Sequence, residues 1–282
     1  MFNKILNNRY KIYNKYSIFE ITNFHTQQNF SINLSDIINK KHDGIILRNW
    51  INENTLLDVL SKINDFPDPF PSPFGSVLGY PLNGAQTPDL TTYLSHVYKT
   101  EKLFSNIWGF DLKNKLRDTF QKLSPNYNVK LAQQKENDYI YGTFRIMNPG
   151  KGALKAHTGN EFYEFNKDLG MHHLDQIAKI LDSMSYFILL QNPTKGGELV
   201  LFDLNWHSTP QHFFGFDSGL RSDKDFEKIK RQDVILNPGD LIIFRGGDIW
   251  HKIMPNEGNK DRVTFGGWIA PSKISKEYYF WA

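Results

Sequence analysis

The sequence predicts an α+β protein in a single domain over residues 1–282, with helices first and a β barrel or sandwich after them. Residues 1–135 contain segments whose apolar side chains recur at helical spacing. Residues 136–282 contain short apolar runs interrupted by Gly, Pro and Asn, which is typical of an all-β core. No internal repeat or linker divides the chain, and its length suits one β domain that carries helices.

The first part predicts one buried strand, several helices and one long loop. Asp-Gly leads into a buried strand within 43–51, and apolar spacing predicts a helix at 53–65. Two more helices are expected at 91–108 and 113–124. Residues 66–84 contain five prolines, which exclude a helix or an inner strand, so an extended loop is expected there. Such a loop is either a surface loop or a flap over an active site.

From residue 139 onward the predicted elements are mainly strands. Each candidate is short and apolar, and they read "YIYGTFRIM", "MSYFILLQN", "GGELVLFDLNW", "GDLIIFRGG", "WHKIMP" and "DRVTFGGWIA". One helix is expected between strands at 172–184, and the charged residues 222–233 are expected to face solvent. The shape of a pocket would depend on loops at 66–86 and 203–233, and the sequence does not specify whether these form a lid.

Composition excludes several classes of function. The chain has no cysteine, which rules out disulfides, thiolate metal sites and cysteine nucleophiles. Its 33 basic and 30 acidic residues interleave without a basic tract, so nucleic acid is not expected as a partner. The N-terminal residues lack the apolar segment of a signal peptide, and the apolar runs are too short to span a membrane. The expectation is a cytoplasmic protein.

Two of the nine histidines stand in a pattern that predicts metal binding. His157 and His251 each end a strand-like segment, and His251 follows "PGDLIIFRGGDIW", a turn, a buried strand and a second turn. The other histidines lack such a context and are expected to be ordinary polar residues, namely His25, His42, His96, His172, His173, His207 and His212.

An arginine follows the second histidine at a sequence spacing that predicts a shared site. Arg262 comes eleven residues after His251 on the next apolar strand, and Thr264 follows on the same strand. A buried guanidinium requires an anion, and its planar fork suits a carboxylate. A dicarboxylic acid that also chelates a nearby metal would satisfy this requirement.

These motifs, in this order, resemble the iron(II)/2-oxoglutarate oxygenases. The matching pieces are His157, "GGELVLF", "GDLIIF…H" and "DRVT". The resemblance implies a double-stranded β-helix, a cupin-like jelly roll, with N-terminal and flanking helices. It also implies iron(II) on His157 and His251, and 2-oxoglutarate on Arg262 with help from the Thr264 hydroxyl. A pair of histidines with a carboxylate and open positions is the signature of non-haem iron enzymes.

The third iron ligand of that pattern is missing here. The family places Asp or Glu two residues after the first histidine, and this chain has Gly159. Members that lack the carboxylate are halogenases, and this chain resembles the freestanding halogenases of the welwitindolinone and hapalindole alkaloid pathways. The matching stretches are "AHTGNEF", "SMSYF", "GGELVLFDLNW", "GDLIIFRGG…H" and "YYFWA". The resemblance implies iron(II), 2-oxoglutarate, O₂ and chloride as cofactors and co-substrates.

Three interpretations of Gly159 follow from the residues. In the first, the glycine leaves a coordination position to chloride, which two neutral imidazoles and no carboxylate would favour. In the second, Glu161 or water replaces the missing ligand, and the chain is a hydroxylase or another oxygenase with an unusual ligand set. In the third, the chain is a non-catalytic ligand-binding jelly roll.

Further residues are candidates for the same site. Tyr141, Thr143 and Arg145 alternate along one predicted strand and are expected to share a face that lines the pocket and helps bind the co-substrate. Ser185 is a candidate for a supporting hydrogen bond, and Asn160 for a bond to an iron-bound oxygen or a halide-bound water. The favoured function is chlorination of an unactivated aliphatic carbon of a freestanding small molecule. The sequence specifies neither the substrate, the halide preference nor the oligomeric state.

Overall fold

The computed structural model describes residues 10–13, 15–27, 29–67, 69–82, 90–151, 154–213 and 223–282. The predicted loops at 66–86 and 203–233 lie partly outside these described residues.

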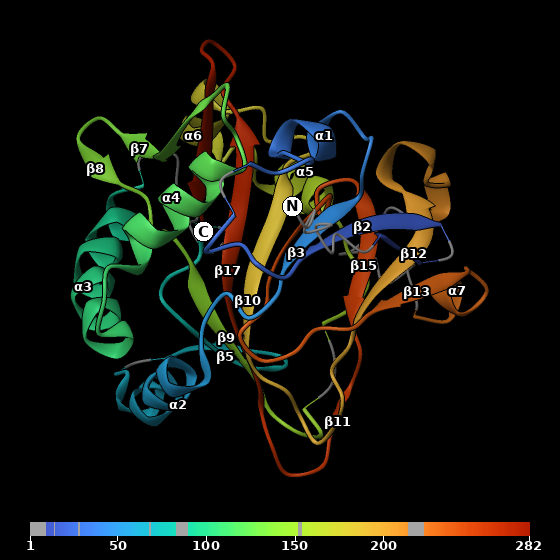
Figure 1. The fold of residues 1–282 in the computed structure, drawn as a ribbon, viewed down its shortest axis with the longest axis horizontal. Helices are drawn as coiled ribbons and strands as arrows, with labels where there is room; N and C mark the ends of the chain where they lie inside the picture. Colours follow the sequence, from blue (N-terminus) through green and yellow to red (C-terminus); the bar gives the residue numbers. More distant parts are fainter. Residues whose placement is uncertain are drawn as a thin grey trace, which may run out of the picture.

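A large sheet of eleven strands forms the centre of the fold (Figure 1). Its path runs β1–β2–β3–β14–β10–β17–β9–β5–β4, with β18 and then β6 joined to β17 off this path. The bounds are β1 Tyr10–Tyr13, β2 Tyr16–Ile21, β3 Gly44–Leu47, β4 Phe70–Ser72, β5 Gly75–Leu78, β6 Asn128–Leu131, β9 Thr143–Met147, β10 Met184–Gln191, β14 Leu241–Phe244, β17 Arg262–Pro271 and β18 Glu277–Trp281.

A second, smaller sheet packs against part of the large one. It consists of β13 (Arg231–Val234), β12 (Leu199–Asn205) and β15 (Ile249–Ile253) in that order. These strands lie together on the right of Figure 1. Two facing sheets of antiparallel core strands are the jelly roll, or double-stranded β-helix, so the predicted fold class is confirmed. Two short antiparallel pairs complete the strands of the described residues: the hairpin β7 (Gln133–Gln134) with β8 (Asn137–Asp138), and the long-range pair β11 (Lys195–Gly196) with β16 (Asn256–Glu257).

Alternation along the strands divides the buried side chains into three layers. Leu199 and Leu201 of β12 belong to a cluster between the sheets, which we call the inter-sheet core. Val200 and Phe202, on the opposite face of β12, belong to an aromatic cluster on the outer side of the small sheet, the outer cluster. The largest layer, the helix-side core, lies between the other face of the large sheet and the helices.

Three helices cover the helix-side face of the large sheet, on the left of Figure 1. They are α2 (Glu53–Lys62), α3 (Thr91–Trp108) and α4 (Leu112–Lys122). Side-chain caps from Asn52 and Asp111 start α2 and α4, and Gly109 in the left-handed region ends α3. The helices predicted at 53–65, 91–108 and 113–124 are therefore confirmed, with Ile63–Asp65 forming a 3₁₀ turn after α2.

Four shorter helices lie elsewhere in the part of the chain that the structure describes. They are α1 (Leu34–Ile38), α5 (Gly159–Asn166), α6 (His172–Ile177) and α7 (Asp223–Glu227). The helix predicted at 172–184 is too long, because Ala178 adopts an extended conformation and forms a β-bridge with Ser272. The charged stretch at 222–233 is not one solvated segment, since β13 pairs with β12.

The division into a helical part and a β part needs correction. Strands from residues 1–135 complete the large sheet, with β2 parallel to β3 and β5 antiparallel to β9. The proline-rich stretch at 66–84 contains the hairpin β4–β5 rather than only a loop. Pro71 is accommodated because β4 is the edge strand of the path, where a missing N–H costs no ladder bond.

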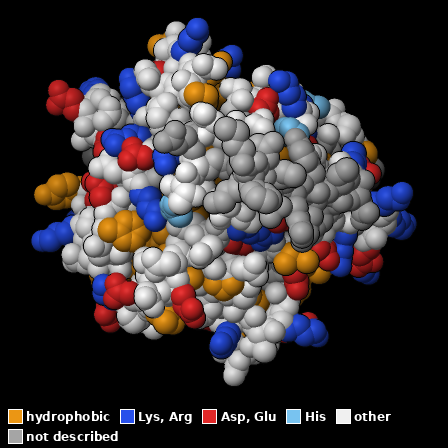
Figure 2. All heavy atoms as spheres, in the orientation of Figure 1, with side chains coloured by type: hydrophobic (Ala, Val, Ile, Leu, Met, Phe, Trp, Pro, Cys, Tyr) orange, Lys and Arg blue, Asp and Glu red, His pale blue; other side chains and the backbone are white. Residues whose placement is uncertain are grey.

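The surface agrees with the mixed charge of the sequence. On the face drawn in Figure 2, basic and acidic side chains are interspersed. Among the described residues, none of the helices combines the length and the apolar character that crossing a membrane requires.

Candidate metal and co-substrate site

His157 and His251 meet across a β-bridge that extends the small sheet. The His157 amide donates to the His251 carbonyl at 2.9 Å, and the His251 amide donates to the His157 carbonyl at 3.0 Å. Their ring centroids lie 4.2 Å apart, so the two imidazoles are neighbours. His251 lies in the middle of β15 rather than at a strand end, and His157 is a single bridged residue. The structure thus brings together the two predicted metal ligands.

Both imidazoles are oriented in the same way. His157 Nδ1 bonds the Lys155 carbonyl at 2.7 Å, and His251 Nδ1 bonds the Ile249 carbonyl at 2.8 Å. A carbonyl only accepts, so each Nδ1 carries a proton, and when a ring is neutral its Nε2 carries the lone pair. Such backbone contacts typically orient metal-binding histidines. Burial lowers the pKa of His251 to about 4, so this ring is neutral at pH 7.

The direction of His251 follows from strand alternation. Ile249 and Ile253, which share its face of β15, belong to the inter-sheet core, whereas Trp250 belongs to the outer cluster. The metal-binding edge of His251 is therefore on the inner side of the small sheet, toward the large sheet.

Gly159 begins a helix instead of ending a strand. Thr158 caps α5, and its hydroxyl accepts a hydrogen bond from the Glu161 amide at 3.1 Å. The Gly159 amide donates to the Gly246 carbonyl at 2.8 Å. A Cβ added at position 159 would lie 3.0 Å from the Gly247 Cα, which is closer than such contacts normally are. Glycine at this position therefore also has a packing reason.

The helix start changes the assessment of Glu161. Glu161 lies in the first turn of α5 and its side chain is buried, so its position is set by a helix start and not by a strand bulge. Within the described part of the chain, the one group of three or more His, Asp or Glu ligand atoms within 4.8 Å of one another excludes His157 and His251.

Arg262 and Arg145 bring two guanidinium groups to the large sheet beside this pair. Arg262 starts β17, and Arg145 on β9 lies opposite Thr264 of β17. Each stacks on an aromatic ring, Arg262 over Phe187 at 5.4 Å and Arg145 over Trp268 at 5.8 Å. The faces of β9 and β17 that carry these arginines point toward the small sheet, because Met147 shares the face of Arg145 and belongs to the inter-sheet core.

Neither arginine has a carboxylate partner among the described residues. Arg262 is 3% exposed, and its buried Nε has no hydrogen-bond acceptor there. Burial, with the positive charge of Arg145, lowers the pKa of Arg262 to about 9, although Glu198 opposes this effect. Burial also lowers the pKa of Arg145. Two desolvated cations without an anion require an anionic ligand.

The donor set therefore fits iron and 2-oxoglutarate. The two Nε2 atoms are the nitrogen ligands that iron accepts. The two guanidinium groups match a dianion in charge and in hydrogen-bond geometry. Glycine at position 197 leaves room for the Arg262 side chain, because a Cβ there would lie 3.0 Å from the Arg262 Cδ.

The remaining predicted residues divide between the site and other roles. Ser185 on β10 shares its face with Phe187 and Leu189 of the inter-sheet core, next to Gly246, where an added Cβ would lie 2.1 Å from the Ser185 Oγ. Thr264 shares the face of Arg262 on β17, and Thr143 shares the face of Arg145 on β9.

Two predictions need revision. Tyr141 does not share the face of Arg145, because it precedes β9 and its ring packs in the helix-side core against Phe104 and Phe265. The side chain of Asn160 is fully buried and both of its polar atoms bond Asp182, so they point away from the role expected at the iron.

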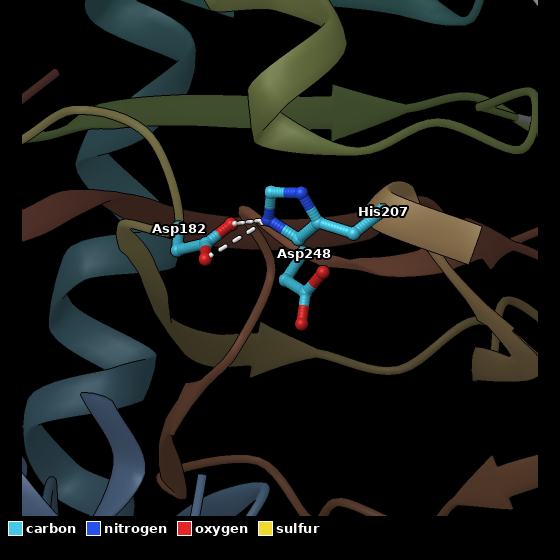
Figure 3. Close-up of side chains that lie close together, drawn as sticks. All are labelled: Asp182, His207 and Asp248. Carbon is cyan, nitrogen blue, oxygen red and sulfur yellow. Dashed lines mark hydrogen bonds and ion pairs between the residues drawn. The ribbon is translucent and has the colours of Figure 1, made fainter. Parts of the chain in front are cut away.

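Sequence reasoning missed the cap at Thr158 and the polar cluster around Asp182. Thr158-Gly159-Asn160-Glu161 has the Thr-x-x-Glu pattern of a helix start, which was the available signal. Asp182, His207 and Asp248 lie together (Figure 3), and no local pattern brings these distant residues together.

Comparison with known proteins gives one family and one fold. The model of the family described as "Carrier-protein-independent halogenase WelO5" matches residues 17–282. A solved N-substituted L-amino acid dioxygenase from Burkholderia ambifaria AMMD aligns with a TM-score of 0.54 at 10% identity, covering 87% of this chain and 89% of that one. Its structure in complex with alpha-KG aligns at 0.53 and 9% identity, with the same coverage of 87% and 89%. No curated protein matches the sequence.

Proposed function

Because the chain belongs to the family of carrier-protein-independent halogenases, we propose that it is an iron(II)- and 2-oxoglutarate-dependent halogenase. Its substrate is a freestanding small molecule, and its product carries chlorine on a previously unactivated aliphatic carbon. The observation that carries this proposal is a histidine pair followed by Gly159, with no carboxylate completing the pair among the described residues.

His157 and His251 hold the iron through Nε2. Their Nδ1 atoms are tied to backbone carbonyls, so the rings are oriented before metal arrives. The bound iron, with O₂ and the co-substrate, supplies the oxidising chemistry that removes a hydrogen atom from carbon. The protein supplies ligands in a fixed arrangement and a largely buried setting that limits access of water.

Arg262 anchors the 2-oxoglutarate. Its guanidinium forms a charge-assisted fork to a carboxylate, and the Thr264 hydroxyl adds a donor on the same strand face. Arg145 lies across the strand pair from Thr264 and contributes a second positive charge. Phe187 under Arg262 keeps the guanidinium in place while its N–H groups face the ligand.

Gly159 leaves the third protein ligand position to chloride. A carboxylate there would fill the position and repel a second anion, whereas neutral imidazoles do not. The positive charges of Arg145 and Arg262 further favour anions in this part of the fold. The hydroxylase alternative requires Glu161, on the first turn of α5, to supply the missing ligand, and among the described residues it forms no close three-ligand group with the two histidines.

The direct test is product mass. The protein is incubated with iron(II), 2-oxoglutarate, O₂, chloride and a hapalindole-type alkaloid. The products are then separated, and their masses are measured by mass spectrometry. The expected product gains one chlorine, recognised by its isotope pattern, and succinate accumulates in step. Omission of 2-oxoglutarate is the control and should abolish both.

Two outcomes would contradict the proposal. A product that gains only oxygen at saturating chloride would make the chain a hydroxylase. Absence of succinate, with or without alkaloid, would favour the non-catalytic jelly roll.

A further inference from the structure

Asn160 and Asp182 form a closed pair of hydrogen bonds behind Gly159. The Asn160 Nδ2 donates to the Asp182 Oδ1 at 2.7 Å, and the Asp182 amide donates to the Asn160 Oδ1 at 2.7 Å. Asn160 is fully buried, so these two bonds satisfy side-chain atoms that have no access to water. The pair links the first turn of α5 to the segment that precedes β10.

The same two segments enclose the Gly246–Gly247 turn. On one side, the amides of Gly159 and Asn160 donate to the carbonyls of Gly246 and Gly247 at 2.8 and 3.0 Å. On the other side, the Gly247 amide donates to the Ser183 carbonyl at 2.8 Å. A Cβ on Gly247 would lie 2.5 Å from that carbonyl oxygen, so the turn fills the space between the segments.

Asp182 is held in place from outside this enclosure. His207 Nε2 bonds its two carboxylate oxygens at 2.9 and 3.1 Å, as Figure 3 shows, and Lys40 Nζ lies 3.3 Å from Oδ2. The backbone of Asp182 has a φ of 60°, an uncommon conformation that persists where surrounding contacts fix it. Burial raises the pKa of Asp182, but bonds from Asn160 and His207 with the charge of Lys40 produce a net lowering, so it is ionised at pH 7.

A second metal at Asp182, His207 and Asp248 does not explain this cluster. Lys40 Nζ lies 3.3 Å from Asp182 and 3.2 Å from Asp248, so one ammonium already bridges the two carboxylates. Arg245 also pairs with Asp248. In Figure 3 no interaction joins Asp248 to the His207 ring. Both carboxylates of this cluster therefore already have a cationic side chain as partner.

We propose that Asp182 is a positioning residue that, through Asn160, fixes the start of α5 and so keeps the position beside Gly159 available to chloride. This inference rests on the proposed function. Asp182 does not touch the metal or the substrate, and it acts only through the Asn160 pair. Loss of the pair lets the first turn of α5 shift on the Gly246–Gly247 turn, while both histidines keep their own backbone contacts.

The test measures chloride binding without turnover. The anaerobic complex with iron(II) and 2-oxoglutarate has a visible charge-transfer absorption, and its shift on chloride titration yields a dissociation constant. Asp182→Gly removes the carboxylate and tolerates the φ of 60°. The paired exchange Asn160→Asp with Asp182→Asn reverses donor and acceptor in the side-chain bond and keeps the bond from the backbone amide of residue 182. Tyr163→Phe is the matched control, since it removes a bond between α5 and Asp175 at a distance from the first turn.

Asp182→Gly is expected to weaken chloride binding by about tenfold or more, with iron(II) affinity within about threefold of wild type. The paired exchange should restore chloride binding to within about threefold, and Tyr163→Phe should leave it within about twofold. Wild-type chloride affinity in Asp182→Gly would overturn this inference but not the proposed function. The same holds if the paired exchange does not restore chloride binding, or if Tyr163→Phe weakens chloride binding as much as Asp182→Gly does. A wild-type complex that does not respond to chloride would overturn the proposed function, and with it the inference.

Discussion

Gly159 and Gly247 approach each other so closely that a Cβ on residue 159 would lie 3.0 Å from the Gly247 Cα. The start of α5 and the turn before β15 are therefore packed backbone to backbone next to the histidine pair. Any side chain introduced at position 159 must displace one of them by a few tenths of an ångström. This contact adds a packing cost to the effect of a new ligand.

Gly159→Asp should stop chlorination while iron still binds, because the new carboxylate completes a two-histidine, one-carboxylate ligand set. The overpacking should cost about 1–3 kcal/mol of folding free energy. Gly159→Ala separates the two effects, since it adds the Cβ without a ligand. Product mass in the presence of chloride is the measurement. Chlorination by the Asp variant at the wild-type level would reduce Gly159 to a packing residue.

His157→Ala and His251→Ala should each abolish stoichiometric iron(II) binding, because a single remaining imidazole is a weak site. Anaerobic titration followed by metal analysis measures this. His96→Ala is the control. His96 lies on α3 and its ring stacks on that of Tyr80 with the centroids 4.7 Å apart, so this variant should keep full iron binding. Full binding in either of the first two variants would disprove the ligand assignment.

Arg262→Leu should raise the 2-oxoglutarate concentration needed for half-maximal succinate release, by the equivalent of about 2–5 kcal/mol. Arg145→Leu should have a smaller effect, since Arg145 supplies a second positive charge whereas Arg262 is the anchor. Arg231→Leu, on the exposed side of β13, is the matched control and should change nothing. An unchanged requirement in Arg262→Leu would mean that another cation holds the co-substrate.

Glu277 should make stability depend on pH at the acid end. The bond from Lys130, with that from Tyr279, lowers the pKa of Glu277 from 4.5 to about 2. A carboxyl whose pKa is lowered by folding stabilises the protein above pH 4.5, and this contribution is lost as pH falls toward 2.

Glu277→Gln should therefore lower the free energy of unfolding at pH 7 by about 0.5–1 kcal/mol, because Lys130 is exposed and solvent screens the pair, and it should flatten the decline below pH 4.5. Denaturant unfolding at several pH values measures both. Glu257→Gln, which removes an exposed partner of Lys195, should change stability by less than about 0.5 kcal/mol. Parallel pH profiles for wild type and Glu277→Gln would contradict the assignment.

The sequence was sufficient for the parts of the site that regular strands position. His251 and Arg262 lie on β15 and β17, where alternation with buried apolar neighbours determines the direction of each side chain. Local spacing also sufficed for α3 and α4, because each buries one apolar stripe.

Long-range pairing explains what the sequence did not reveal. Nothing local shows that β5 pairs with β9, or that prolines in β4 fall on an edge strand. Asn160 is polar and stands close to His157 in sequence, which suggests a role at the metal. In the fold, however, both polar atoms of its side chain bond Asp182. The face of Tyr141 was misjudged because alternation holds only within a strand, and β9 starts at Thr143.

Trp250 precedes His251 on β15 and faces the opposite side of the small sheet. Its ring is fully buried 5.3 Å from that of Phe226, and its Nε1 donates to the Thr209 hydroxyl at 2.7 Å. This indole is thus a built-in fluorophore, one residue from the metal and screened from any molecule in the inter-sheet space. The difference in emission between wild type and Trp250→Phe would report metal arrival at His251 optically, in real time and without a substrate.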